Sequence, residues 1–303
     1  MEENKVKLHW QLFLIVLVLG LVGIFYIILK RQDIYDSAAL YLGLPLLIAL
    51  GFSLIPKRKT AMGSTMKGMT IALLLSAYVF QEGYICILFA APLFYLVGAI
   101  VAWQVDKARK RKEKTYQAAA VASVIALLSL EGTSELTTMP REQAVVVTKL
   151  INANIQHVRH QIAKTPKFDD NRPAFLKIFP YPENIVGEGL EVGDIRQATF
   201  VAYKHIWWTK VQGDLAFKVI ESEPDRIKFA VTKDDSYVSH YLKWQSSEVS
   251  LEAIDTAHTQ VTWKHEYRRT LDPFWYFGPL QYYAVKLATE QLIDRVATPE
   301  LKS

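Results

Sequence analysis

Hydrophobic positions are spread unevenly along the chain, and their spacing divides it into two parts. The first 133 residues contain long apolar stretches, and a helix needs about 20 apolar residues to cross the hydrocarbon layer of a membrane. From residue 134 onward, apolar and polar positions mostly alternate, as they do in strands with one buried face. The pattern predicts a membrane-spanning domain at 1–133 and a water-soluble domain at 134–303.

The apolar stretches of the first part predict an α-helical bundle of about five spans. They cover approximately residues 10–29, 37–55, 67–82, 84–103 and 116–131. The third and fourth spans come from one apolar stretch that is too long for a single crossing, even when tilted. Gln81, Glu82 and Gly83 interrupt this stretch, and a polar group with a glycine is typical of a turn.

Positive charge in this part predicts which side of the membrane each loop occupies. The formal net charge is +5, and lysine and arginine gather at 57–67 and 107–114. Basic loops remain in the cytoplasm, so the amino terminus is expected inside. Five crossings then place the second domain outside, in the periplasm if the source has an inner membrane. Because topology accounts for the basic charge, we expect no nucleic-acid partner. Cys86 is the one cysteine, which excludes a disulfide within the chain.

The second part predicts an α+β fold. Strands are expected at 144–151, 196–205, 215–219, 227–231, 249–253 and 261–267. A helix is expected at 152–164, capped by Asn152, and three prolines make 168–183 irregular. An aromatic turn at 272–279 leads to a terminal helix at 280–296. Its apolar stripe consists of Leu280, Ala284, Leu287, Ala288, Leu292 and Val296. A helix of this kind buries its stripe on the concave face of the antiparallel sheet, which is the helix-grip order of elements.

Several segments also resemble one protein superfamily. They are Ile185-Val186-Gly187-Glu188-Gly189, Val192-Gly193-Asp194, the strand from Thr262-Trp263 to Tyr267-Arg268-Arg269, and Trp275-Tyr276-Phe277-Gly278-Pro279. Over 141–296 the chain is similar to the START-like, or SRPBCC, superfamily, and most of all to its polyketide cyclase/dehydrase and lipid transport type. The resemblance implies a sheet folded around the terminal helix, with a cavity for a hydrophobic ligand. Some members of the superfamily carry a membrane-spanning amino-terminal half. No catalytic motif carries over.

His265 is the candidate site residue, because the alternation of the last strand places it inward between Trp263 and Tyr267. A histidine in a cavity could act as a general base or orient a polar group of the ligand. The alternative is a core histidine with a satisfied hydrogen bond, or a histidine at the cavity rim. The predicted cavity lining is Phe217, Phe229, Trp263, His265, Tyr267, Tyr283 and Leu287.

Other signals for chemistry are weak. His157 and His160 lie three residues apart on a predicted helix, but the spacing of a zinc motif is absent. We therefore expect neither a metal nor a cofactor. Trp207 and Trp208 are adjacent and point to opposite faces, so at least one of them should lie at the surface or at a cavity rim. Residues 237–244 form a loop or short strand that could act as a lid.

Three functions fit this sequence. The favoured one is an integral membrane protein whose extracytoplasmic START-like domain binds a lipid or other hydrophobic small molecule. A cyclase- or dehydrase-like enzyme would use the same cavity, with His265 as its base. A non-catalytic sensory or interaction module would instead present an exposed apolar patch.

Overall fold

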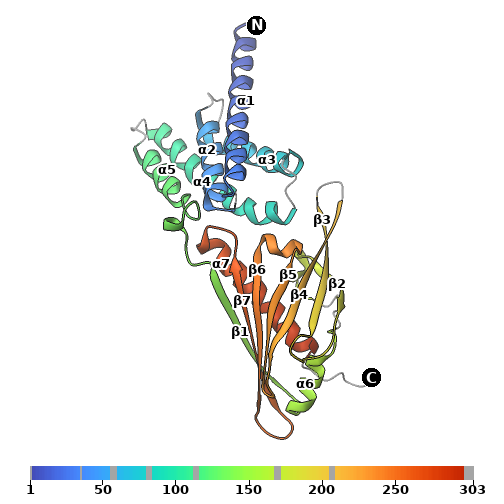
Figure 1. Cartoon of the computed structure of the whole chain (residues 1–303). Helices are drawn as coiled ribbons and strands as arrows, with labels where there is room; N and C mark the ends of the chain where they lie inside the picture. The colour runs from blue at the N-terminus through green and yellow to red at the C-terminus, as the bar shows by residue number, and fades with distance from the viewer. Residues whose placement is uncertain are drawn as a thin grey trace. The chain divides into compact units, whose positions relative to one another are not determined.

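The chain folds into two compact units (Figure 1). The computed structural model describes residues 2–34, 36–54, 60–79, 84–111, 116–166, 172–204 and 209–296. Unit 1 comprises Met1–Met139 with the short segments Lys204–Trp208 and Leu271–Trp275. Unit 2 comprises Pro140–Tyr203, Thr209–Thr270 and Tyr276–Ser303.

Unit 1 is helical. Its elements are α1 (Glu2–Arg31), a π-helical turn (Ala39–Gly43), α2 (Leu44–Leu54), α3 (Ala61–Val79), α4 (Tyr84–Arg111) and α5 (Tyr116–Leu128). The carboxylate of Asp106 caps α3 by accepting from the backbone N–H groups of Ala61, at 2.7 Å, and Met62, at 3.0 Å. Glycine lets α2 and α3 approach closely, because a Cβ at Gly68 would lie 2.7 Å from the ring of Phe52.

The number of candidate membrane spans differs from the prediction. Within the described residues, 2 helical segments are long and apolar enough to cross a membrane, Phe13–Arg31 and Ile85–Lys110. Ala39–Phe52 and Ala119–Leu128 are apolar but shorter than a crossing needs. The first turns of α3 are rich in Gly, Ser, Thr and Lys, which lowers its hydropathy below that of a span. Five spans was therefore wrong. A buried helix of a soluble protein or a signal sequence has similar length and composition, so membrane insertion stays a prediction.

Unit 2 is an α+β body with a 7-stranded sheet in the order β1-β7-β6-β5-β4-β3-β2. The strands are β1 (Glu142–Ile151), β2 (Tyr181–Val186), β3 (Ile195–Lys204), β4 (Thr209–Ser222), β5 (Arg226–Asp234), β6 (Leu242–Ala253) and β7 (Thr259–Arg269). Pairing is antiparallel wherever the register is described, and β1 pairs with β7. The short helix α6 (Ile155–Ala163) follows β1, and the long helix α7 (Phe274–Val296) ends the described chain. A curled antiparallel sheet with a long terminal helix is consistent with the predicted helix-grip fold (Figure 1).

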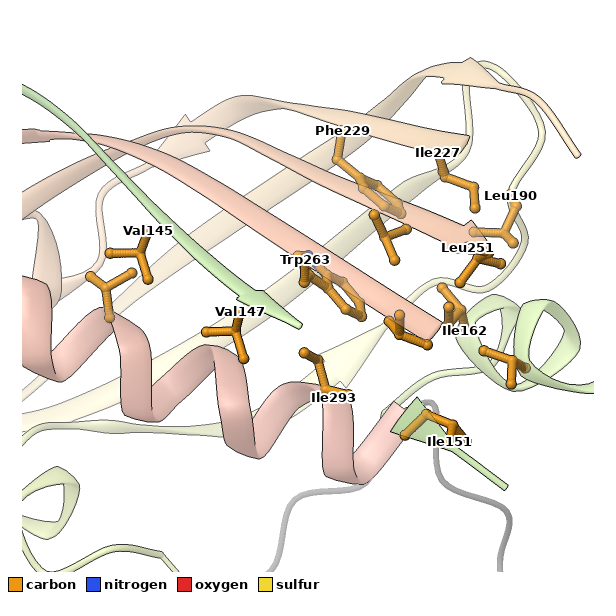
Figure 2. Packing of buried hydrophobic residues seen from close by; sticks show 14 of the residues in the cluster. Val145, Val147, Ile151, Ile162, Leu190, Ile227, Phe229, Leu251, Trp263 and Ile293 are labelled. Atoms are coloured by element: carbon orange, nitrogen blue, oxygen red, sulfur yellow. The ribbon is translucent and has the colours of Figure 1, made fainter. Parts of the chain in front are cut away.

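The interior of unit 2 is an apolar cluster drawn from the sheet, α6 and α7. In Figure 2, Val145 and Val147 of β1, Trp263 of β7 and Ile293 of α7 gather between the strands and the helix. Val158 and Ile162 attach α6 to the same cluster. Alternate residues of β7 are buried, which confirms the inward face that the sequence predicted for this strand.

The terminal helix differs from the prediction in its start and in its buried face. It begins at Phe274, so most of the predicted aromatic turn is helical, and Pro279 lies inside the helix. Burial of Phe277 is a tertiary contact of the kind that overrides local helix propensity, including that of the proline. The buried face consists of Phe277, Gln281, Val285, Thr289 and Ile293. The predicted stripe is only partly buried, with Leu292 packed against the apolar cluster. The polar residues Gln281 and Thr289 occupy inward positions that hydrophobic periodicity assigns to apolar side chains.

Two smaller expectations also change. The cap of α6 is Asn154, whose side-chain oxygen accepts from the backbone N–H of His157 at 2.8 Å, and not Asn152. Part of the segment predicted to be irregular forms β2, although this strand contains Pro182. Because β2 is the last strand of the sheet, it is an edge strand, where a residue without an N–H group is tolerated.

Candidate functional site

The predicted cavity residues on the sheet belong to the interior of unit 2. Phe229, Trp263 and Tyr267 are buried members of the apolar cluster, and the partly buried Phe217 packs against them. The indole Nε1–H of Trp263 donates to Ser247 Oγ at 2.7 Å, inside the same interior. These four aromatic side chains are therefore packed among neighbours, and little of their surface is free to contact a ligand.

The two predicted residues on α7 lie in more open surroundings. Tyr283 is 49% exposed, and its ring lies 5.2 Å from the ring of Phe175. Leu287 is half-buried. Residues Tyr237–His240 form a 3₁₀ turn, and β6 begins at Leu242. Trp207 and Trp208 lie outside the described residues.

His265 is enclosed by aromatic rings on the inward face of β7. Its exposed fraction is 6%, and in the sheet it lies opposite Val145 of β1 and Ser247 of β6. The ring of Trp263 is stacked with the imidazole, with ring centroids 6.1 Å apart. The ring of Trp244 meets the imidazole edge-on, with centroids 5.2 Å apart. Burial lowers the pKa of His265 from 6.5 to about 4, so the imidazole is neutral at neutral pH.

The imidazole also lacks a hydrogen bond that a buried group normally makes. Among the described residues, no donor or acceptor reaches Nδ1 of His265. An unsatisfied buried polar atom costs about 1–3 kcal/mol, so such atoms are rare in folded proteins. At Nδ1, His265 therefore differs from a core histidine with a satisfied hydrogen bond. Burial is the cause of its lowered pKa. Among the described residues, no carboxylate contributes to this shift, as the partner of a general base would.

A second unsatisfied polar side chain lies on the buried face of α7. Gln281 is 6% exposed, and its Nε2 donates to the carbonyl oxygen of Tyr241 at 2.6 Å. Its Oε1 is buried and has no partner within the described part of the chain. Sequence reasoning missed Gln281. The available signal was its place four residues before Val285 and eight before Thr289, on one helical face.

Four aromatic rings form a chain of contacts that includes Tyr241, the residue that accepts from Gln281. We call Phe175, Phe179, Tyr241 and Tyr283 the aromatic strap. The ring centroids of Phe175 and Phe179 are 5.7 Å apart, and those of Phe179 and Tyr241 are 6.0 Å apart. The strap joins the segment before β2, the segment before β6 and α7, and Tyr241 is also the residue that accepts from Gln281. Tyr241 therefore links Gln281 to the strap, whereas the exposed Tyr283 lies on a different face of α7 from the buried Gln281.

An open pocket of about 410 Å³ lies elsewhere on unit 2. It is lined by Glu223, Asp225, Arg226, Ser250, Leu251, Glu252, Gln260 and Thr262. None of the seven predicted cavity residues belongs to this lining. Gln260 and Thr262 alternate with the buried Val261 and Trp263 along β7, so the pocket opens mainly on the other face of the sheet. Its polar lining does not suit a hydrophobic ligand.

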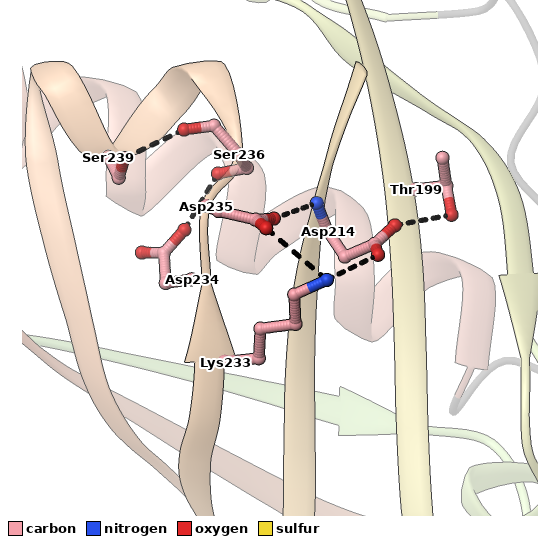
Figure 3. Close-up of polar contacts among 7 residues, drawn as sticks. All are labelled: Thr199, Asp214, Lys233, Asp234, Asp235, Ser236 and Ser239. Carbon is pink, nitrogen blue, oxygen red and sulfur yellow. Dashed lines mark hydrogen bonds and ion pairs between the residues drawn. The ribbon is translucent and has the colours of Figure 1, made fainter.

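A charged network joins β3, β4 and β5 (Figure 3). Lys233 Nζ donates to Asp214 Oδ2 at 2.8 Å and lies 3.2 Å from Asp235 Oδ2, while Thr199 Oγ1 donates to Asp214 Oδ1 at 2.9 Å. The hydrogen bond from Lys233, followed by that from Thr199, holds the pKa of Asp214 below its ordinary value. Within the described ranges, no group of three or more His, Cys, Asp and Glu side chains could hold a metal ion. The network links β3 and β4 to the residues at the end of β5.

Comparison with known proteins adds no family assignment. No family model and no curated protein matches the chain. A protein from Chromobacterium violaceum is 15% identical, with 54% of this chain and 100% of that chain covered and a TM-score of 0.34. Norcoclaurine synthase from Thalictrum flavum, in complex with dopamine and hydroxybenzaldehyde, is 14% identical, with coverages of 50% and 87% and a TM-score of 0.29. A Polyketide_cyc-like protein from Corynebacterium glutamicum is 14% identical, with coverages of 52% and 84% and a TM-score of 0.26. Likenesses this low carry no conclusion about this chain.

Proposed function

We propose that unit 2 binds a hydrophobic small molecule or lipid between the inward face of its sheet and α7. The observation that carries the proposal is His265, a buried imidazole among aromatic rings whose Nδ1 has no partner in the described structure. A polar group of the ligand would satisfy this nitrogen, with an apolar part of the ligand against the rings. Few, well-placed polar groups in an apolar interior are typical of small-molecule sites.

The packed cluster sets where such a ligand can lie. Ile293, Val147 and Trp263 fill the interior near the carboxy-terminal half of α7 (Figure 2). We therefore propose that the ligand occupies the other half, bounded by His265, by Gln281 and by Tyr241 and Phe179 of the aromatic strap. Each square ångström of apolar ligand surface buried there contributes roughly 25 cal/mol before the entropic costs of binding.

Bound material in the full chain tests this function. Native mass spectrometry of the full chain, purified in detergent, should show a bound hydrophobic molecule that organic extraction then identifies. His265→Trp should lower the bound fraction about 10-fold or more, since the larger ring fills the space beside Trp244 and Trp263. His258→Trp is the matched control, because His258 lies outside the strands in the partly exposed β6–β7 turn. Equal loading of both variants, or a protein without a ligand, would contradict the proposal.

We further propose that the helices of unit 1 anchor the chain in the membrane, and that a further crossing besides α1 and α4 places unit 2 outside the cytoplasm. The support is the apolar length of α1 and α4 together with the basic residues that end α4, Lys107, Arg109 and Lys110. An odd number of crossings is needed to place the two chain ends on opposite sides. The two candidate spans alone would return unit 2 to the side of the amino terminus.

A pair of reporters fused after Ser303 tests the sidedness. Alkaline phosphatase is active only outside the cytoplasm, and green fluorescent protein exported by the general secretory route stays dark. We expect an active phosphatase and a dark fluorescent fusion. The reverse result would place unit 2 in the cytoplasm, with an even number of crossings.

A further inference from the structure

We propose that the ligand is a neutral lipid-like alcohol whose hydroxyl group donates a hydrogen bond to Oε1 of Gln281. This inference rests on the proposed function, because it specifies the chemistry of the molecule bound in the same interior. It is carried by Gln281 itself and by the side chains around it.

The orientation of the Gln281 amide is determined by its one hydrogen bond. Nε2 donates to the carbonyl oxygen of Tyr241 at 2.6 Å, and a carbonyl oxygen can only accept. The flipped amide would set two acceptors against each other, so the assignment of nitrogen and oxygen is unambiguous. The atom left buried and without a partner in the described structure is therefore Oε1, which accepts hydrogen bonds and cannot donate them.

This acceptor selects among hydrophobic ligands. A hydrocarbon, an ether or an ester has no donor, so binding one would leave Oε1 unsatisfied. A carboxylate has acceptors only and would bring its charge against the amide oxygen. His265 offers it no compensating charge, because its buried imidazole is neutral. A hydroxyl group supplies the missing donor without a charge.

The surroundings of Gln281 suit the apolar part of such an alcohol. Tyr241 accepts from Gln281, and its ring meets that of Phe179 edge-on at 6.0 Å. Rings of this strap offer apolar faces that pack against a hydrocarbon chain. A buried acceptor bonded next to the aromatic residue Tyr241 matches a molecule with a hydroxyl group at one end and a hydrocarbon chain behind it.

Three probes with the same chain length test the inference on the full protein in detergent. We would measure the dissociation constants of dodecan-1-ol, its methyl ether and dodecanoate by isothermal titration. The wild type should bind the alcohol about 10-fold or more tighter than the ether and the carboxylate, the penalty expected when a buried acceptor loses its partner. Gln281→Met removes the acceptor at similar length and should bring the alcohol-to-ether ratio close to one. Gln260→Met, on the other face of the sheet, should leave the ratio unchanged.

The outcomes separate this inference from the proposed function. Equal affinity of the wild type for alcohol and ether would overturn the inference and leave hydrophobic binding intact. Tighter binding of the carboxylate than of the alcohol would overturn it as well. Failure of all three probes to bind would contradict the proposed function itself. The wild-type ratio needs no substitution, so the test holds even if Gln281→Met does not fold.

Discussion

Replacing Trp263 by alanine should lower the stability of unit 2 by about 3–5 kcal/mol, the usual cost of removing a large buried ring. Trp263 is almost fully buried, belongs to the apolar cluster and stacks on His265. The substitution leaves a cavity between β7 and α7 and also leaves Ser247 Oγ without the donor that it has at 2.7 Å. Both losses act on the same centre of the unit.

Amide hydrogen exchange in the full chain measures this effect locally, which avoids assuming one cooperative transition for two units. Amides of β6 and β7 should exchange about 100-fold or more faster in Trp263→Ala, as a loss of about 3–5 kcal/mol requires. Ile254→Ala is the matched control, because Ile254 is 52% exposed in the turn after β6, and its effect should stay within about 0.5 kcal/mol. Unchanged exchange in Trp263→Ala would show that Trp263 does not hold sheet and helix together.

The strands of unit 2 were the part of the fold that the sequence predicted best. On β7, Val261, Trp263, His265 and Tyr267 are all buried while their neighbours are more exposed, because a period of two leaves each strand with one inward face. The helix α7 was harder to predict. Its inward face includes Gln281 and Thr289, and a polar residue on a buried face shifts any stripe read from apolar residues alone.

The candidate site shows the same limit. Sequence reasoning placed His265 inward with Trp263 as a neighbour, since both lie on one strand. It could not place Trp244, whose ring meets the imidazole from β6, because cross-strand neighbours depend on the register, and the ladder between β6 and β7 shifts between Trp244 and Ser246. Gln281 came from a different element altogether. Long-range partners of this kind follow from tertiary packing, which local pattern does not contain.

Acid should destabilise unit 2 through His265, and replacing this residue by leucine should remove that sensitivity. The imidazole has an ordinary pKa of about 6.5 in the unfolded chain and a pKa of about 4 in the folded one, because it is buried. As the pH falls from 6.5 towards 4, the unfolded state binds the proton first, so protonation favours unfolding. The contribution of His265 to stability is fully present above pH 6.5. As the pH falls it is lost by up to about 1.4 kcal/mol per pH unit, and the total loss is about 3 kcal/mol near pH 4.

His265→Leu should be about as stable as the wild type at pH 8, because no hydrogen bond to Nδ1 is lost and the two side chains are similar in size. At pH 5 the variant should be the more stable by about 2 kcal/mol. The carboxylates of Asp214 and Asp235, whose pKa values are lowered by hydrogen bonds, also lose stabilising interactions as the pH falls, but they do so in both proteins. Hydrogen exchange of β7 amides across pH 4.5–8, corrected for intrinsic rates, therefore isolates His265 as the difference between the two profiles. Parallel profiles would mean that the imidazole of His265 is not held neutral in the interior. That result would remove the observation on which the proposed function rests.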